Sequence, residues 1–507
     1  MTYYILASSI NKNIHNYISF TLEKNSNKIL ESCNNDIEDT KKSLCDKQAT
    51  TDDEKINDNK SNIKKHDYNE FNTYNNFISN SLYNNLCKFK KQIEDNYEYW
   101  DNIKKFTNPY EFIHTTIPSH KVSVSKLKPL SRSFYKMIEM VKIFNFFNIK
   151  KSNTYLNKNN IDSTDIPFIE SKITTECEKI SPPLSPTNSN SCNIETKNEC
   201  YNDIYKEKLV SFHLAEGPGG FIEALTYLRK SSSDIYYGMT LVNDDPNCPG
   251  WRKSKVFLEN NPNVSIIYGA DNTGNLLSMD NLEYCISNYK NKIDIITADG
   301  GIDVSNDFNK QEQLVCSLII AEVLYAIIMQ KKGGHFILKV FDIFSKTTVD
   351  LLYILTALYG EVYIMKPCTS RIANSEKYIV CKNFLLDDST EISEVFKREF
   401  IKICSQSNDN IISLLTIPHD YYFLNRIEEI NAILGQQQIE NIITTINTIT
   451  NKHSNEKIEN MKKTNIQKAI NWCEKYDIPY NKIYNSNNIF LTNSTSWNNK
   501  QNNDMEI

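Results

Sequence analysis

A single lysine, Lys339, interrupts a run of apolar residues in Phe336-Ile337-Leu338-Lys339-Val340-Phe341-Asp342. An ammonium group among such side chains is costly unless a carboxylate lies beside it or its pKa falls. A lysine in that setting can act as an acid or a base in an enzyme. It can also form a salt bridge that only fixes the strand, so Lys339 is a candidate for proton transfer with a structural alternative.

An aspartate, Asp299, follows directly on another apolar run, in Ile293-Asp294-Ile295-Ile296-Thr297-Ala298-Asp299-Gly300-Gly301. If that run is a parallel strand, Asp299 lies at its carboxyl end, where open α/β sheets bind ligands. Capping of the next helix or turn would place an aspartate there equally well. Asp299 is the second candidate.

A glycine-rich turn, Ala215-Glu216-Gly217-Pro218-Gly219-Gly220-Phe221, stands between an apolar run and a helical pattern. Glycines let the backbone approach a ligand closely, and the start of a helix attracts a carboxylate or phosphate. The spacing fits neither the dinucleotide fingerprint nor the P-loop, which disfavours both ligand classes. The turn is a candidate cofactor loop, with a ligand-free tight turn as the alternative.

The segments that carry these residues alternate with helical patterns. Residues 132–147 form an amphipathic pattern, and apolar residues recur at helical spacing in residues 314–323 and 349–358. Strands separated by helices of this length predict an α/β fold with a mainly parallel sheet. Seven short runs are predicted as strands: Val210 to Leu214, Ile235 to Leu241, Val264 to Tyr268, Ile293 to Thr297, Phe336 to Phe341, Val362 to Met365 and Tyr378 to Cys381.

Changes in composition divide the 507 residues into four parts. Residues 1–105 form an N-terminal region with a polar tract at about 24–79 that we expect to be disordered. The α/β domain is expected over 106–386, with a low-complexity insertion at about 152–203. Residues 387–484 have helical patterns, and 485–507 look like a flexible tail.

The overall composition limits the classes of partner and compartment. The net charge of −5 requires a local basic patch for any nucleic-acid contact. The 13 cysteines form no C-x-x-C pair and fit a disulfide framework poorly, which favours a reducing compartment and no metal. No segment resembles a signal peptide or a membrane span, so we expect an intracellular protein without a membrane partner.

Taken together, the motifs resemble the FtsJ-like ribose methyltransferases, and more specifically the Adrift-type group that methylates the first transcribed nucleotides of capped mRNA. That family has a Lys-Asp-Lys-Glu tetrad, whose first lysine lies in the pattern S-R-x-x-x-K-x-x-E. The segment Ser131-Arg132-Ser133-Phe134-Tyr135-Lys136-Met137-Ile138-Glu139 matches it. Asp299, Lys339 and Glu376, the last in S-R-x-x-N-S-E-x-Y-I-V, fill the other three positions.

The resemblance implies a Rossmann-like class I methyltransferase sheet with helices on both faces, an antiparallel member among its last strands, and S-adenosylmethionine as cofactor. The chain departs from the usual family loop in having Glu216-Gly217 before Pro218. By the resemblance, Asp271 and Asn272 lie near the adenosine. The cofactor loop comprises Glu216, Gly217, Pro218, Gly219, Gly220 and Phe221.

The hypothesis for the reaction is RNA ribose 2′-O-methylation with Lys339 as general base. A ribose hydroxyl is a poor nucleophile, so transfer needs deprotonation and alignment with the methyl group. We expect the ammonium of Lys136 to lower the pKa of Lys339, and Asp299 and Glu376 to orient both lysines. Arg132 and Arg371 are candidates for RNA contacts, with a solvated basic face as the alternative.

Two other functions stay open from the sequence. An FtsJ-type methyltransferase of ribosomal or transfer RNA would use the same chemistry. A retired scaffold subunit would bind RNA, or a protein partner through the C-terminal helices, without catalysis. The Asn-rich composition suggests a large DNA virus, with action in the host cytoplasm, or an AT-rich protist, with action in the nucleus.

Overall fold

The computed structural model describes residues 2–9, 13–23, 78–118, 120–147, 207–243, 250–301, 309–405, 410–451 and 455–481. The tail expected at 485–507 and the insertion at 152–203 lie outside these residues. So does the N-terminal tract apart from residues 78 and 79. The division of the chain at residues 105 and 386 stays a prediction.

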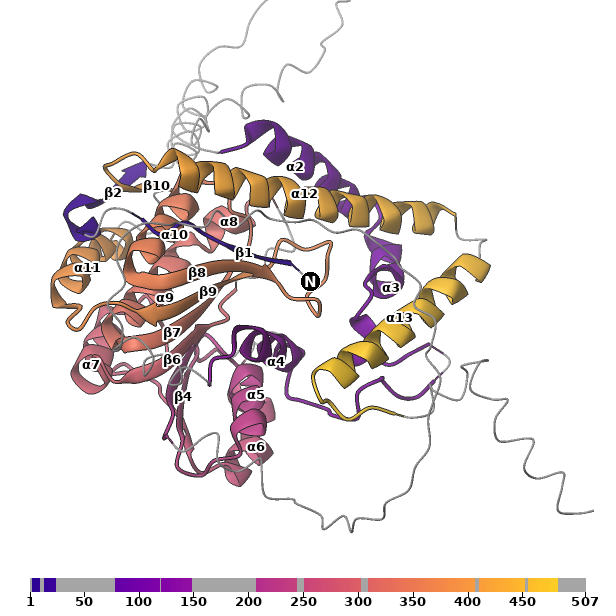
Figure 1. Ribbon diagram of the computed structural model, residues 1–507, viewed down its shortest axis with the longest axis horizontal. Coiled ribbons are helices and arrows are strands. Elements are labelled where there is room, and N and C mark those ends of the chain that lie inside the picture. Colours follow the sequence, from indigo (N-terminus) through magenta and orange to yellow (C-terminus); the bar gives the residue numbers. More distant parts are fainter. Residues whose placement is uncertain are drawn as a thin grey trace, which may run out of the picture. The chain divides into compact units, whose positions relative to one another are not determined.

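A mixed sheet of eight strands forms the centre of the described chain, in the order β1-β8-β9-β7-β6-β3-β4-β5 (Figure 1). Strands β3, β4, β5, β6 and β7 pair with one another in parallel, whereas β9 runs antiparallel to both β7 and β8. The strands are β1 (Thr2–Ile5), β3 (Val210–Leu214), β4 (Ile235–Met239), β5 (Val264–Ile266), β6 (Ile293–Ala298), β7 (Gln330–Val340), β8 (Tyr359–Lys366) and β9 (Lys377–Phe384).

This arrangement confirms the expected Rossmann-like sheet and its antiparallel member, and all seven predicted strands are present. The eighth strand, β1, was not predicted. It is short and pairs only with β8 at the edge of the sheet. Half-exposed Tyr3 and Ile5 give it no clear pattern of buried residues.

Helices cover both faces of the sheet (Figure 1). On one face α7 (Met279–Tyr289), α9 (Cys316–Met329) and α10 (Lys346–Leu358) share a continuous apolar core with the strands. On the other face lie α4 (Ser133–Phe144) and α5 (Gly220–Arg229), where the rings of Phe134 and Tyr227 are 5.6 Å apart. Shorter elements are η1 (Ile14–Tyr17), η5 (Trp251–Ser254), α6 (Lys255–Asn260) and α8 (Gln311–Leu314), and α11 (Thr390–Ser405) packs on α9.

Helices from both ends of the chain pack together beside the sheet (Figure 1). The N-terminal ones are α2 (Asn80–Glu94), α3 (Tyr97–Thr107) and η3 (Glu111–Ile113), and the C-terminal ones are α12 (Tyr421–Thr450) and α13 (Asn455–Lys475). The core that α2, α3 and α12 share contains Ile93, Trp100, Ile442 and Ile449. A second, two-stranded sheet joins β2 (Ile18–Glu23) to β10 (Asn410–Leu415).

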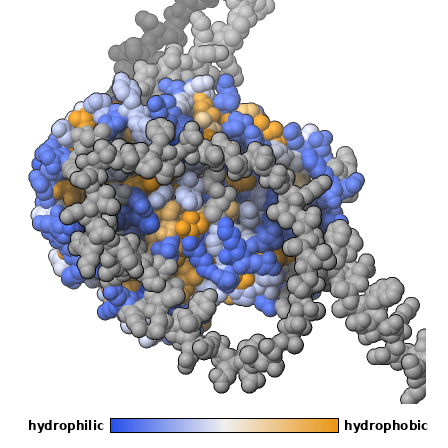
Figure 2. Space-filling view, in the orientation of Figure 1, coloured by the Kyte–Doolittle hydropathy of each residue, from blue (hydrophilic) through white to orange (hydrophobic). Residues whose placement is uncertain are grey.

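The surface visible in Figure 2 is mixed, with hydrophilic residues over much of the periphery and hydrophobic residues gathered near the middle. Among the helices that the structure describes, none has the length and apolar character that crossing a bilayer requires.

Candidate active site

The first lysine and the glutamate of the tetrad form a buried ion pair. Lys136 projects from α4, and Glu376 immediately precedes β9. Lys136 Nζ lies 2.6 Å from Glu376 Oε1, and both side chains are largely buried. Residues 240 positions apart in the chain are therefore brought into direct contact.

The second lysine pairs with the aspartate in the same way. Asp299 directly follows β6, and Lys339 lies in the neighbouring strand β7. Lys339 Nζ donates to the backbone oxygen of Asp299 at 2.6 Å and lies 3.2 Å from its Oδ1. Parallel pairing of β6 and β7 explains this contact, because the carboxyl ends of the two strands meet at one edge of the sheet.

A tyrosine joins the two ion pairs. Tyr378, fully buried in β9, accepts a hydrogen bond from Lys136 Nζ at 3.2 Å. Its hydroxyl donates to Asp299 Oδ1 at 2.8 Å. The result is an unbroken chain of polar contacts from Glu376 through Lys136, Tyr378 and Asp299 to Lys339.

The expected effect of Lys136 on Lys339 is wrong for this structure. Burial opposes the ammonium form of Lys339, but the carboxylates of Asp299 and Glu376 outweigh burial and hold its pKa above the ordinary value. Lys136 is neutralised by Glu376 instead of acting as an unpaired cation. Of the two outcomes expected for a buried Lys339, a nearby carboxylate is the one that occurs.

Three lysines stabilise the anionic form of Glu376. Burial alone would raise its pKa, but the ammonium groups of Lys136, Lys339 and Lys366 hold the pKa well below the ordinary value. Lys366 Nζ also donates to the backbone oxygen of Glu376 at 2.7 Å. The tetrad therefore balances two ammonium groups against two carboxylates, a neutral arrangement that is much cheaper to bury than an unpaired charge.

The glycine loop follows β3 and opens α5. Gly219 has a φ of +102°, a left-handed conformation that favours glycine. One oxygen of the buried Glu216 accepts a hydrogen bond from the backbone N–H of Phe221 at 2.7 Å. The other lies 3.7 Å from His213 Nδ1 and has no hydrogen-bond partner within the described part of the chain. Burial, and then the charge of Asp299, raise the pKa of Glu216 well above its ordinary value.

These features fit a cofactor that carries an ammonium group. A buried carboxylate oxygen without a partner is costly and can accept from such a group. The start of a helix such as α5 (Gly220–Arg229) also attracts a carboxylate. S-adenosylmethionine offers both groups at its methionine end, so the loop is suited to hold it.

Asp271 and Asn272, the residues expected near adenosine, lie in the exposed loop after β5. Both carboxylate oxygens of Asp271 hold this loop together, one through Thr273 and the other through Ser278. These hydrogen bonds lower the pKa of Asp271. The loop conformation of Asp271 is thus explained without a ligand, and the adenosine contact stays a prediction.

The two arginines expected to contact RNA share one buried carboxylate. Arg371 donates two hydrogen bonds of 3.1 and 2.7 Å to Glu111, and Arg132 Nη1 lies 3.6 Å from the same carboxylate. Arg132 also donates to the backbone oxygen of Thr369 at 2.7 Å. Two cations on one anion leave an excess of positive charge close to Glu376, and both arginine side chains are about 30% exposed (28% and 31%).

Sequence reasoning missed two buried residues of the site. Tyr378 lies two positions after Glu376. Side chains two positions apart along a strand project from the same face, and this alternation was the signal that could have placed Tyr378 beside the tetrad. Glu322, within the apolar helix α9, is fully buried, and burial raises its pKa to about 8. A charged residue in an apolar helix was visible in the sequence, but its proximity to Lys339 was not.

Residues 194–384 match the FtsJ-like methyltransferase family. The chain carries an FtsJ-like methyltransferase domain. Asp299, Lys339 and Glu376 lie inside the matched residues, whereas Lys136 lies upstream of them.

Several curated proteins are similar to this chain over just under half of its length. A cap-specific mRNA (nucleoside-2′-O-)-methyltransferase 2 of Drosophila melanogaster is 32% identical over 244 residues, which are 45% of this chain and 34% of the relative. A cap-specific methyltransferase 1 of Trypanosoma brucei brucei is 30% identical over 256 residues, 48% of this chain and 65% of the relative. A Caenorhabditis briggsae relative, 28% identical over 249 residues (46% of this chain, 29% of the relative), is named inactive. The chain thus covers less than two thirds of each of these relatives.

Proposed function

We propose that the protein is an S-adenosylmethionine-dependent RNA ribose 2′-O-methyltransferase that acts on the first transcribed nucleotides of capped mRNA. The observation that carries this proposal is the chain of contacts from Glu376 to Lys339. It joins two lysines and two carboxylates at the carboxyl edge of the sheet.

In this proposal Lys339 takes the proton of the 2′-hydroxyl. Lys339 must first be neutral, and any positive charge brought close to it lowers its pKa and favours that state. S-adenosylmethionine supplies, when bound, an electrophilic methyl group on a cationic sulfur. Lys136 and Asp299 then fix the position of the reacting hydroxyl. This alignment supplies the larger part of the rate enhancement, because the hydroxyl oxygen must attack the methyl group in line with the bond that breaks.

The capped substrate is favoured by the names of the relatives and by the filled tetrad. The arginine pair next to Glu376 offers a cationic contact for the RNA backbone, although the whole chain is acidic. A retired scaffold is expected to lose at least one tetrad residue, and all four are present here.

The test is transfer of a labelled methyl group from S-adenosylmethionine to short capped RNA. Uncapped RNA and capped RNA already 2′-O-methylated on its first nucleotide are run beside it. Transfer to the capped RNA alone, lost on premethylation, is the expected result and assigns the first nucleotide. Transfer to uncapped RNA would show that the substrate belongs to another class of RNA. If the protein binds the cofactor but transfers no methyl group to any of these RNAs, the proposal is overturned.

The variant Glu216→Gln tests the binding of the cofactor separately. The amide keeps an oxygen for the N–H of Phe221 but loses the charge that an ammonium group would meet. We expect calorimetry to show S-adenosylmethionine binding about 10-fold weaker, the cost of one charge-assisted hydrogen bond. Glu223→Gln, in helix α5 directly after this loop, is the control. Equal affinity in both variants would exclude Glu216 from the cofactor site.

A further inference from the structure

The loop between β8 and β9, residues 367–376, carries both Arg371 and Glu376 and lies outside the helices and strands. A loop of this kind does not fix its own position, since few of its polar backbone groups pair within the loop. The groups that satisfy its backbone therefore decide where the two side chains lie.

One of these groups comes from the end of α3. The backbone N–H of Ile372 donates to Asn108 Oδ1 at 2.9 Å. Asn108 is 4% exposed and follows the last residue of α3. Its amide nitrogen donates to Lys104 O at 2.6 Å, which fixes the orientation of the acceptor.

A second group comes from the middle of α12. Gln438 Nε2 donates to the backbone oxygen of Ala373 at 2.9 Å and to Ser375 Oγ at 3.4 Å. Gln438 is 4% exposed, and Ala373 packs on the core that α2, α3 and α12 share. Ser375 directly precedes Glu376, so α12 holds the residue next to the catalytic carboxylate.

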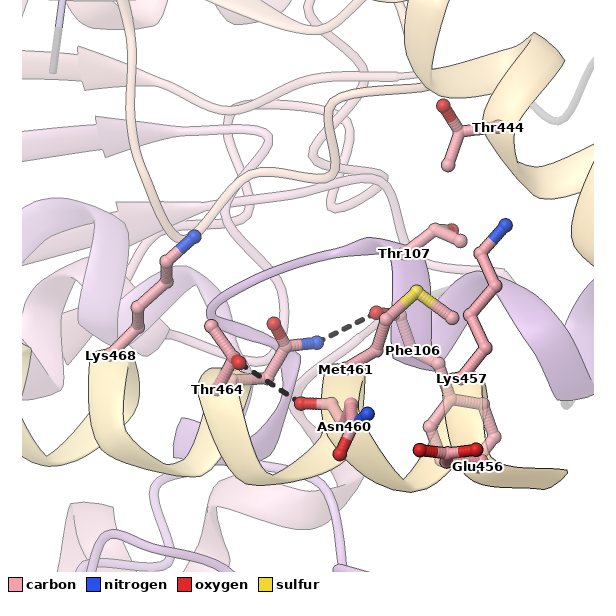
Figure 3. Close-up of a pocket in the computed structure, with 10 residues that line it drawn as sticks. Phe106, Thr107, Thr444, Glu456, Lys457, Asn460, Met461, Thr464 and Lys468 are labelled. Carbon is pink, nitrogen blue, oxygen red and sulfur yellow. Dashed lines mark hydrogen bonds between the residues drawn. The ribbon is translucent and has the colours of Figure 1, made fainter. Parts of the chain in front are cut away.

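The end of α3 is itself held by both C-terminal helices. Asn441 of α12 donates to the backbone oxygen of Thr107 at 2.9 Å. Asn465 of α13 donates to that of Phe106 at 2.7 Å. A pocket of about 530 Å³ lies at this junction and is lined by residues of α3, α12 and α13 (Figure 3). The three helices thus form one support behind Asn108.

We propose that α3, α12 and α13, which lie outside the residues matched by the FtsJ-like family, are positioning elements for the catalytic loop. They act through Asn108 and Gln438 and set the places of Arg371 and Glu376, and through Glu376 that of Lys136. The inference rests on the proposed function for its effect on catalysis. The C-terminal helices then position residues of the active site in the same chain.

The first test does not depend on catalysis. Hydrogen exchange of the full chain is measured for Gln438→Ala, Asn108→Ala and the control Gln437→Ala, an exposed neighbour on the same helix. Loss of one hydrogen bond predicts exchange about 5-fold faster in peptides covering residues 368–376 of the first two variants. Rates equal to those of Gln437→Ala, in variants that melt as the wild type does, would overturn the proposal.

The second test measures turnover on the RNA that the wild type methylates. We expect Gln438→Ala to lower kcat about 10-fold through misplacement of Glu376, with the affinity for S-adenosylmethionine unchanged. Faster exchange with a wild-type kcat would also overturn the positioning role. A wild type that methylates no RNA would defeat the proposed function, while the exchange rates would still decide whether the helices hold the loop.

Discussion

Tyr378 and Lys339 lie opposite each other in the antiparallel pair of β9 and β7, so that both side chains project from one face of the sheet. The hydroxyl of Tyr378 donates to Asp299 Oδ1 at 2.8 Å, and Lys339 Nζ lies 3.2 Å from the same oxygen. A phenol and an ammonium group therefore compete for one carboxylate oxygen. This competition makes Tyr378 a means of adjusting the proton affinity of Lys339.

Tyr378→Phe removes the hydroxyl and keeps the ring. Asp299 then attracts the ammonium of Lys339 more strongly, so the pKa of Lys339 rises and the rising limb of the pH–rate profile moves to higher pH. Loss of a hydrogen bond to a charged group, about 1.5 kcal/mol, predicts a kcat about 10-fold lower at neutral pH. Profiles of kcat against pH measure both effects.

Tyr359→Phe is the matched control for that variant. Tyr359 is also fully buried, and its hydroxyl donates to Gln330 at 2.9 Å, away from the tetrad. Tyr359→Phe should lower the stability of the fold without shifting the profile of kcat against pH. If both phenylalanine variants shift the profile alike, Tyr378 has no particular link to Lys339.

Lys339→Ala should abolish methyl transfer while cofactor binding persists. Removal of a general base and a positioning group predicts a loss of at least about 10³-fold in kcat. Single-turnover transfer and calorimetry with S-adenosylmethionine measure the two properties. Lys332→Ala, at an exposed position of the same strand, should keep full activity. Substantial transfer by Lys339→Ala would assign the base to another group.

Glu376→Gln should move the rising limb of the pH–rate profile to lower pH. The carboxylate of Glu376 raises the pKa of Lys339, so its removal favours the neutral amine. Lys136 also loses its counter-ion, and its unpaired charge acts in the same direction. We expect kcat at the optimum to fall about 100-fold as the alignment is lost. A limb that stays in place or moves upward would contradict this electrostatic account.

Glu322→Gln should change how stability depends on pH. Burial raises the pKa of Glu322 from 4.5 to about 8, so between these values the folded chain holds a proton that the unfolded chain has lost. Stability of the wild type must then fall as pH rises, by up to about 1.4 kcal/mol per pH unit, relative to the variant. Denaturant unfolding at pH 5, 6.5 and 8 measures this difference. If the difference in unfolding free energy between wild type and Glu322→Gln does not change with pH, Glu322 does not take up a proton on folding. The same trend in the exposed Glu394→Gln would show that the pH dependence does not come from Glu322.

The sequence by itself predicted seven of the eight strands of the main sheet and named the four tetrad residues, whose catalytic roles stay a prediction. Alternating apolar runs and helical patterns predict the parallel strands, because burial on both faces requires continuous apolar residues. The positions of Asp299 and Lys339 at the carboxyl ends of two predicted strands place them at one edge of the sheet. The resemblance added Lys136 and Glu376, which spacing alone does not connect.

The tertiary structure decided which charges neutralise which. Pairing of Lys136 with Glu376, and of Lys339 with Asp299, depends on distances across α4, β6, β7 and β9. The direction of the shift in the pKa of Lys339 follows from these distances, because Coulomb energies in a buried site vary steeply with separation. The link from Gln438 to the loop before Glu376 likewise joins residues with no shared local pattern. Local patterns encode elements and exposure, whereas contacts between distant segments arise only when the helices and the sheet pack.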